Sequence, residues 1–160
     1  MLKRDFEDQT CSIARALELV GERWTLLIVR NVFLGVRRFD DLQEQLGIAR
    51  NVLAGRLARL VEADLLERRP YGERPVRYEY RLTERGRALW PVLVELMQWG
   101  DRYAPAAGGP PTVVRHRGCG GLLGPHRACQ RCGALLELED VLAEPGPGAS
   151  TEHPLLARAA

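Results

Sequence analysis

The chain has 160 residues, of which 46% are hydrophobic and 28% are charged, and its formal net charge is +2. This length suits one domain of about 100 to 150 residues with an appendage, and the composition is that of an ordinary globular protein. No stretch approaches the roughly 18 apolar residues of a membrane span, and the N-terminus lacks the apolar core of a secretory signal. We therefore expect a cytoplasmic protein without membrane contact, whose four cysteines serve as reduced thiols, metal ligands or redox sensors.

The first part of the chain predicts three short helices. The first covers residues 11–20 and has Thr10 as its cap, and the second covers residues 24–34. The third covers residues 40–46 and ends at Gly47, a residue suited to closing a helix. A tight connection after Gly47 then leads into a fourth helix. The third and fourth helices together form a helix-turn-helix, whose second helix normally reads the major groove of DNA.

Residues 48–82 are the stretch around which the chain is organised. The first half has one apolar helical stripe, made of Leu53, Leu57, Leu60 and Val61. Residues 77–82 instead alternate in period two, as in a half-buried strand, and pair with a strand at residues 65–69 across a turn-rich loop. Helix, strand, loop and strand in this order predict a winged helix, which is an α+β fold that is mainly α, with a β-hairpin as its wing.

The predicted wing is strongly basic. Between Arg68 and Arg81 five arginines oppose two glutamates, a local charge of +3 in a chain of +2. Such a concentration favours a duplex phosphate backbone, because each neutralised phosphate releases counterions. A solvated hairpin face with internal ion pairs is the alternative. Gly55 favours DNA, because a glycine on the polar face of the helix would let that helix lie deep in a major groove.

A further helix is predicted from Thr83, as its cap, to Arg102, with a kink at Pro91. Its apolar seam consists of Leu89, Val92, Leu93, Leu96 and Trp99. A winged helix of about 100 residues cannot easily bury this seam together with the apolar faces of the first two helices, and such leftover helices usually pair across a two-fold axis. We therefore expect a homodimer with flanking dimerisation helices; the alternative is a monomer whose last helix folds back.

Several segments together resemble the HxlR-type winged-helix transcription regulators of bacteria, which are related to the MarR-like group. The resemblance covers about the first 100 residues and is carried by Cys11, Gly21-Glu22-Arg23-Trp24, Arg38-Phe39-Asp40-Asp41-Leu42, Arg56-Leu57, and residues 78–86 (YEYRLTERG). It implies a homodimer with the first and last helices at the interface, and a recognition helix and wing from each protomer on double-stranded DNA. Gly55 and Ala58 depart from the family pattern, because larger polar residues are more usual there.

Ten residues are the predicted DNA contacts. We expect Arg37, Arg38, Arg50 and Arg56 to hold phosphates, Asn51 and Arg59 to reach base edges, Arg74 to probe the minor groove, and Arg68, Arg69 and Arg77 to complete the basic wing.

Cys11 matches a cysteine that senses oxidants, quinones or aldehydes in several family members. A thiol in the first turn of a helix has its thiolate favoured by the helix dipole. Against this, three acidic residues lie close before it in sequence, and a small residue buried at a dimer interface is the alternative reading.

The last third of the chain has a different character. A Pro/Gly-rich linker at residues 104–112 is followed by a predicted ribbon at 113–142 and a tail, expected to be disordered, at 143–160. These follow a winged-helix domain at residues 1–103.

Within the ribbon segment, two pairs of residues have the spacing of metal-binding knuckles. They are His116-x2-Cys119 and Cys129-x2-Cys132, with a glycine after the second residue of each pair. Four N/S ligands suit tetrahedral zinc, and so short a segment needs a metal in place of a core. We predict one zinc per protomer; His126 fits less well as the fourth ligand, and a Cys129–Cys132 redox pair or free thiols are the alternatives. If the ribbon is a separate unit from the winged helix, we expect that removing its zinc with a chelator leaves dimerisation and most of the DNA affinity intact.

These patterns favour one function over its rival. The predicted function is a sequence-specific, DNA-binding regulator of transcription that acts as a homodimer and responds to redox or electrophile stress or to a small-molecule effector. The alternative is a protein-interaction module with a metal-binding ribbon. No combination of nucleophile, base and orienting group can be named, and four protein ligands would close a metal site, so we expect no enzyme.

Overall fold

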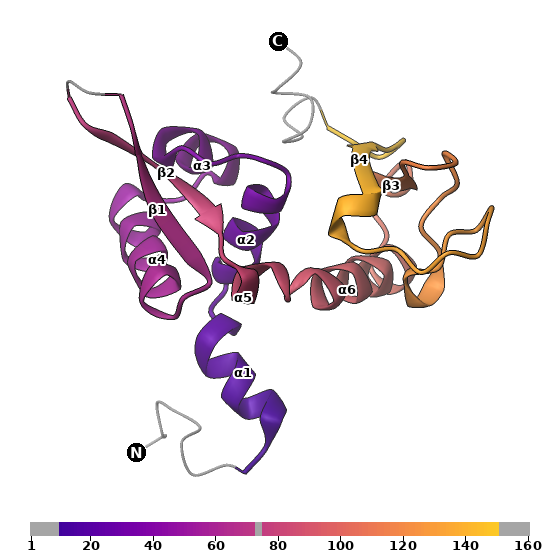
Figure 1. The fold of residues 1–160 in the computed structure, drawn as a ribbon, viewed down its shortest axis with the longest axis horizontal. Coiled ribbons are helices and arrows are strands. Elements are labelled where there is room, and N and C mark those ends of the chain that lie inside the picture. Colours follow the sequence, from indigo (N-terminus) through magenta and orange to yellow (C-terminus); the bar gives the residue numbers. More distant parts are fainter. Residues whose placement is uncertain (1–9, 73–74, 151–160) are drawn as a thin grey trace. The chain divides into compact units, whose positions relative to one another are not determined.

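The computed structural model describes residues 10–72 and 75–150 (Figure 1). The chain divides into two compact units, Met1–Gly86 and Arg87–Ala160. Within the described residues no helix is both long enough and apolar enough to cross a membrane.

The first unit is a winged helix-turn-helix, as the sequence predicts. Its elements are α1 (Ser12–Val20), α2 (Thr25–Phe33), α3 (Phe39–Leu46), α4 (Arg50–Glu62), β1 (Leu66–Tyr71), β2 (Arg77–Leu82) and the short α5 (Glu84–Arg87). The strands β1 and β2 pair antiparallel, from Leu66 opposite Leu82 to Tyr71 opposite Arg77. This hairpin forms the wing, and the mixed α+β fold class is confirmed.

The apolar periodicity of α4 creates the core of this unit. The side chains of Leu53, Leu57 and Leu60 are 0%, 1% and 2% exposed, respectively. The other buried apolar residues of this unit include Ile28, Val29, Val32, Leu42, Ile48, Leu65 and Leu66. Val61, which the pattern placed in the same stripe, is 38% exposed, so the buried face of α4 is narrower than predicted.

The tight turn of the helix-turn-helix is formed by Gly47, the C-cap of α3, whose φ of 59° lies in the left-handed region. The wing is tied to the segment before α3, because the Tyr80 N–H donates a hydrogen bond of 2.8 Å to the Arg37 carbonyl. At the start of the chain the predicted cap was wrong. Cys11, not Thr10, occupies the N-cap of α1, and it makes no side-chain capping bond.

The helix predicted from Thr83 to Arg102 is broken, not kinked. The α5 helix ends at Arg87, and α6 (Trp90–Tyr103) begins three residues later with Pro91 in its first turn. A proline fits there without strain, because the first backbone N–H groups of a helix have no partner within the helix. Thr83 does cap α5, since its Oγ1 accepts a hydrogen bond of 3.0 Å from the Gly86 N–H.

The second unit combines α6 with the segment predicted to be a ribbon. It contains β3 (Thr112–His116), β4 (Val141–Pro145) and two single turns of 3₁₀-helix, η1 (Pro125–Arg127) and η2 (Leu138–Asp140). The strands pair antiparallel, with Val114 opposite Ala143. Its core consists of Val94, Val114, Leu123, Cys129, Leu136 and Val141.

Part of the segment predicted to be a disordered tail is ordered. Residues 143–145 lie in β4, and the N–H groups of Gly146 and Gly148 donate to the carbonyls of Pro111 and Pro110, respectively. The C-terminal end of the linker thus lies beside the first part of the predicted tail. The remainder of the predicted tail, residues 151–160, is outside the described residues.

Candidate functional site

The outer face of α4 is exposed and open. Asn51, Gly55, Ala58 and Arg59 are all exposed, whereas the leucines on the opposite side are buried. A Cβ atom placed on Gly55 would meet nothing within 4 Å, so no internal packing requires this glycine. This face is therefore free to approach a flat or grooved partner closely.

Two arginines of α4 differ in how tightly the protein holds them. Arg50 forms an ion pair of 3.2 Å with Asp40, and its side chain remains 70% exposed. Arg56 forms an ion pair of 2.8 Å with Glu22, and its side chain is only 21% exposed. Arg50 can therefore be shared with an outside anion more readily than Arg56.

Arg56 and Arg59 also line an open pocket of about 480 Å³ among α1, α2 and α4. Its other charged lining residues are Glu18, Glu22 and Glu62. These acidic side chains offset the positive charge of both arginines. The local net charge around the C-terminal half of α4 is therefore less positive than the sequence of the helix alone indicates.

Aromatic rings support several of the arginines near the wing. The Arg38 guanidinium lies 4.8 Å from the centre of the Tyr71 ring, and the Arg68 guanidinium lies 4.1 Å from that of Tyr78. Such contacts restrict a guanidinium without neutralising its charge. The sequence did not predict this role for the tyrosines, because neither lies directly opposite its arginine: Tyr78 pairs with Pro70 in the hairpin, and Arg38 lies before α3.

The other predicted DNA contacts vary in their surroundings. Arg37 and Arg77 are exposed, and Arg69 forms an ion pair of 2.6 Å with Glu67 on the same strand. Arg74 lies outside the described residues. Exposed arginines therefore lie on the wing, on the segment before α3 and on α4 itself.

The four predicted metal ligands come together in the second unit. The ligand atoms of His116, Cys119, Cys129 and Cys132 all lie within 4.8 Å of one another. His116 Nδ1 is 3.3 Å from both the Cys119 Sγ and the Cys132 Sγ, and the Cys119 and Cys129 sulfurs are 3.4 Å apart. Tetrahedral zinc separates such ligand atoms by about 3.5 to 3.8 Å. The residues present fit one metal ion.

Each half of this centre has the same backbone geometry. The Gly120 N–H donates to the His116 carbonyl at 2.8 Å, and the Gly133 N–H donates to the Cys129 carbonyl at 2.9 Å. Both glycines have positive φ, 71° and 74°, a conformation that other residues rarely adopt. The glycine after each pair therefore closes the turn that aims two ligands at one point. His126, the alternative ligand in the sequence, is not in the cluster.

The thiols of the centre differ in acidity. Backbone N–H groups of Cys132 and then Arg131 lower the pKa of the Cys129 thiol to about 6. The backbone N–H of Gly121 favours the Cys119 thiolate, but burial and hydrogen bonds to Cys129 and Cys132 outweigh it, so the pKa of Cys119 is raised. A thiolate at Cys129 under neutral conditions prepares the site for a cation.

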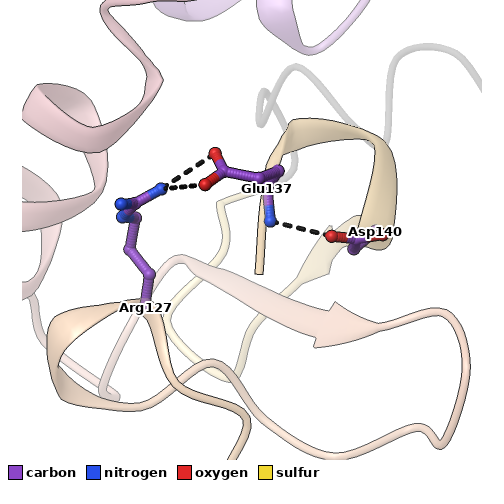
Figure 2. Close-up of polar contacts among 3 residues, drawn as sticks. All are labelled: Arg127, Glu137 and Asp140. Carbon is purple, nitrogen blue, oxygen red and sulfur yellow. Dashed lines mark hydrogen bonds and ion pairs between the residues drawn. The ribbon is translucent and has the colours of Figure 1, made fainter. Parts of the chain in front are cut away.

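Arginines brace the loops that carry the ligands. Arg131 donates to the Cys119 carbonyl at 2.6 Å. Figure 2 shows that Arg127 reaches both carboxylate oxygens of Glu137, each at 2.9 Å, while the Glu137 N–H donates to the Asp140 carboxylate. These contacts of Arg127 and Arg131 hold together the loops on which the candidate ligands lie.

Cys11, the predicted sensor, is an exposed free thiol at the N-cap of α1. Its carbonyl accepts a hydrogen bond of 3.0 Å from the Arg15 N–H. It lies in the first unit, whereas the other three cysteines belong to the metal-ligand cluster of the second unit.

Comparison with known proteins places this geometry in a family. The model of HxlR-like helix-turn-helix proteins matches residues 19–107, which is more than half of the chain. The chain belongs to the HxlR-like family. The HTH-type transcriptional regulator Rv3095 of Mycobacterium tuberculosis is 52% identical over 147 residues, which cover 92% of each chain. YodB of Bacillus subtilis, an HTH-type transcriptional regulator, is 37% identical over 89 residues, covering 55% of this chain and 80% of YodB.

Solved structures agree with this assignment. The crystal structure of PA1607, a candidate transcription factor, superposes with a TM-score of 0.68 at 37% identity and covers 84% of this chain and 94% of its own. PA1374 of Pseudomonas aeruginosa, another candidate transcription factor, has a TM-score of 0.52 at 41% identity and covers 92% of this chain and 99% of its own. This HxlR-like protein is therefore a DNA-binding transcriptional regulator. The match to Rv3095 extends beyond residue 107, where the family model ends, and so covers more of the second unit.

Proposed function

We propose that this HxlR-like regulator binds a two-fold symmetric operator as a homodimer, with α4 of each protomer in a major groove. The observation that carries this proposal is the open outer face of α4, where Asn51 and Arg59 flank a glycine with free space around it. A helix without a bulky central side chain can lie deep in the groove, and half-sites should be about one helical turn apart or a small multiple of it.

Exposed apolar side chains support the dimer. On α1, Ile13 and Leu17 are 71% and 45% exposed, and on α6, Leu96 and Trp99 are 49% and 59% exposed. Apolar residues at helical spacing on a surface usually mark an interface, and a two-fold axis lets one patch cover the same patch on its partner.

Different arginines would contact different parts of the DNA. Arg37, Arg38 and Arg50 are exposed and would hold phosphates, as would Arg56 after exchanging its ion pair with Glu22. Arg59 and Asn51 would reach base edges. The wing arginines Arg68, Arg69, Arg74 and Arg77 would follow the backbone and the minor groove.

The same proposal includes one zinc ion per protomer, held by His116, Cys119, Cys129 and Cys132. The donor set of three sulfurs and one imidazole nitrogen matches zinc in composition and in spacing. Because all four positions are protein ligands, the ion would stabilise the fold and leave no place for a reacting water. A regulator acting on DNA would work in the cytoplasm, where its thiols stay reduced.

We also propose that Cys11 gives a redox response. Its thiol is exposed at the start of α1, a helix with exposed apolar residues of the proposed interface. YodB, a relative by family, has been crystallised in a reduced form. Oxidation at this position would alter the surface where two protomers meet.

Two measurements on one preparation test the proposed function. Light scattering should give the mass of two chains, and a duplex from the promoter region of the protein's own gene should be bound more tightly than a random duplex of equal length. A monomer that retains no promoter fragment at low salt would contradict the proposal. A protein that captures a partner protein but no DNA would support the alternative interaction module.

A further inference from the structure

The α6 helix has two apolar faces. On the inner face, Val94 is 1% exposed, and Trp90 and Met97 are partly buried against the same core. On the outer face, four side chains at spacings of four, three and four residues are between 49% and 61% exposed; they are Val92, Leu96, Trp99 and Tyr103. We call these four residues the α6 stripe. The helix therefore lies between a core on one side and an unpartnered apolar surface on the other.

The core under the inner face is the core of the metal-ligand cluster. Cys129, one of the four ligands, is 2% exposed and belongs to the same buried group as Val94. Cys119, a second ligand, packs against that group. A side chain of α6 and two metal ligands thus share one small core.

Polar contacts fasten the helix to the same loops. The Gln98 amide donates a hydrogen bond of 2.9 Å to the carbonyl of Gly124, which lies between the two ligand pairs. Arg87, just before the helix, forms an ion pair with Glu139 of η2. Among the described residues of α6, Val94 alone is fully buried. The position of α6 within this unit consequently depends on its contacts with the loops that carry the ligands.

Those loops cannot be expected to hold their shape without an ion. The residues from β3 to β4 form only a few short strands and single helical turns around six buried side chains, and so small a core normally requires a metal or disulfides. All four cysteines are free thiols. An isolated helix of the length of α6 is only marginally stable in water. If the loops lost their structure, α6 would lose the contacts that fix it, and the residues of the α6 stripe would no longer be held in one arrangement.

We infer that metal occupancy of the His116, Cys119, Cys129 and Cys132 site controls dimerisation, and through it DNA binding, by fixing α6 with its stripe turned toward a second copy of this chain. This inference rests on the proposed dimeric, zinc-holding regulator. It reverses the expectation from sequence that zinc could be removed without loss of the dimer, because that expectation treated the ribbon as separable from α6. The metal site then regulates the protein, in addition to stabilising it.

The test uses the full chain as purified. Zinc content is measured by elemental analysis, mass by light scattering, and affinity for the promoter duplex by fluorescence anisotropy, before chelation, after chelation and after zinc is added back. We expect chelation to convert dimer to monomer and to lower affinity by about 100-fold or more, because the second half-site then gains nothing from linkage to the first. Zinc should restore both properties, and magnesium should restore neither.

Three variants separate the steps. Cys132→Ser should lose zinc and the dimer together, while Cys11→Ser should keep both. Leu96→Lys, on the α6 stripe, should keep its zinc and still be a monomer. Because chelation of the unaltered chain is reversible, the test does not depend on Cys132→Ser folding.

The outcomes that overturn the inference are distinct from those that overturn the proposed function. A zinc-free protein that remains a dimer with unchanged affinity overturns the inference alone, as does Leu96→Lys that remains a dimer. A zinc-loaded protein that is monomeric and binds no DNA overturns the proposed function and the inference with it. A purified protein that never binds zinc overturns the inference and the proposed zinc site, while DNA binding by the dimer is judged separately by light scattering and promoter binding.

Discussion

Replacing Gly55 with alanine should stabilise the protein. Gly55 lies inside α4, four residues or more from either end, and an added Cβ would meet no atom within 4 Å. Glycine in a helix interior costs about 0.8 to 1.0 kcal/mol relative to alanine. With no clash to offset this gain, we expect the free energy of unfolding to rise by about 0.5 to 1 kcal/mol, which is a shift in melting temperature of roughly 2 to 8 °C for a unit of this size.

Gly86→Ala is the matched control with the opposite sign. A Cβ at Gly86 would lie 2.0 Å from the Leu65 carbonyl oxygen, a separation that forces the backbone to move. We expect it to lose about 1 to 3 kcal/mol of unfolding free energy. Thermal unfolding followed by circular dichroism measures the stability of both variants. The protein concentration is kept the same throughout, because the melting temperature of a dimer depends on concentration.

The same pair of variants also tests the role of α4. If its outer face enters a groove, the methyl group of Gly55→Ala should lower DNA affinity even though the protein is more stable. If Gly55→Ala destabilises the protein as much as Gly86→Ala does, the reasoning about Gly55 is refuted. Such a result would mean that the outer face of α4 has no room for a methyl group.

Five further substitutions, used in three experiments, have definite expected results. Gly121→Ala would place a Cβ 2.6 Å from a ligand sulfur, so zinc affinity measured by competition should fall about 10-fold or more, while Gly100→Ala, with no atom within 4 Å of its Cβ, should bind zinc normally. Arg59→Ala should relax sequence preference at one position by about 1 to 3 kcal/mol, whereas Arg38→Ala should weaken binding to all duplexes similarly; equal losses across sequences for both would exclude base contact by Arg59. Peroxide or a quinone should change promoter affinity in the unaltered protein but not in Cys11→Ser, and an identical response in both would remove Cys11 as the sensor.

Local patterns were sufficient to predict the winged helix. The leucines of α4 recur at a period near 3.6, Gly47 sits where a left-handed residue must end α3, and the alternating tyrosines mark β2. Each of these signals acts within a few residues, so one sequence contains it completely. The cluster of four candidate metal ligands was predictable for the same reason, since each pair has fixed short spacing and its own glycine.

Packing between distant segments was not predictable in this way. The sequence placed Leu89 and Leu93 on one apolar seam of the last helix, whereas the residue that α6 buries fully is Val94. Period alone cannot distinguish the face toward a core from the face toward a partner when both are apolar. Likewise, the ion pair of Arg56 with Glu22 joins residues more than thirty positions apart, and nothing local to α4 predicts it.

The salt dependence of DNA binding by the dimer is the most direct test of the account. Affinity for the promoter duplex is measured by anisotropy across a series of salt concentrations, with zinc bound and the dimer confirmed by light scattering. For six to ten phosphate contacts, the slope of log K against log salt should be about −5 to −9, and Arg38→Ala should make it shallower by about one. A slope near zero, or one equally steep for a variant lacking the exposed wing arginines, would contradict DNA recognition by this surface.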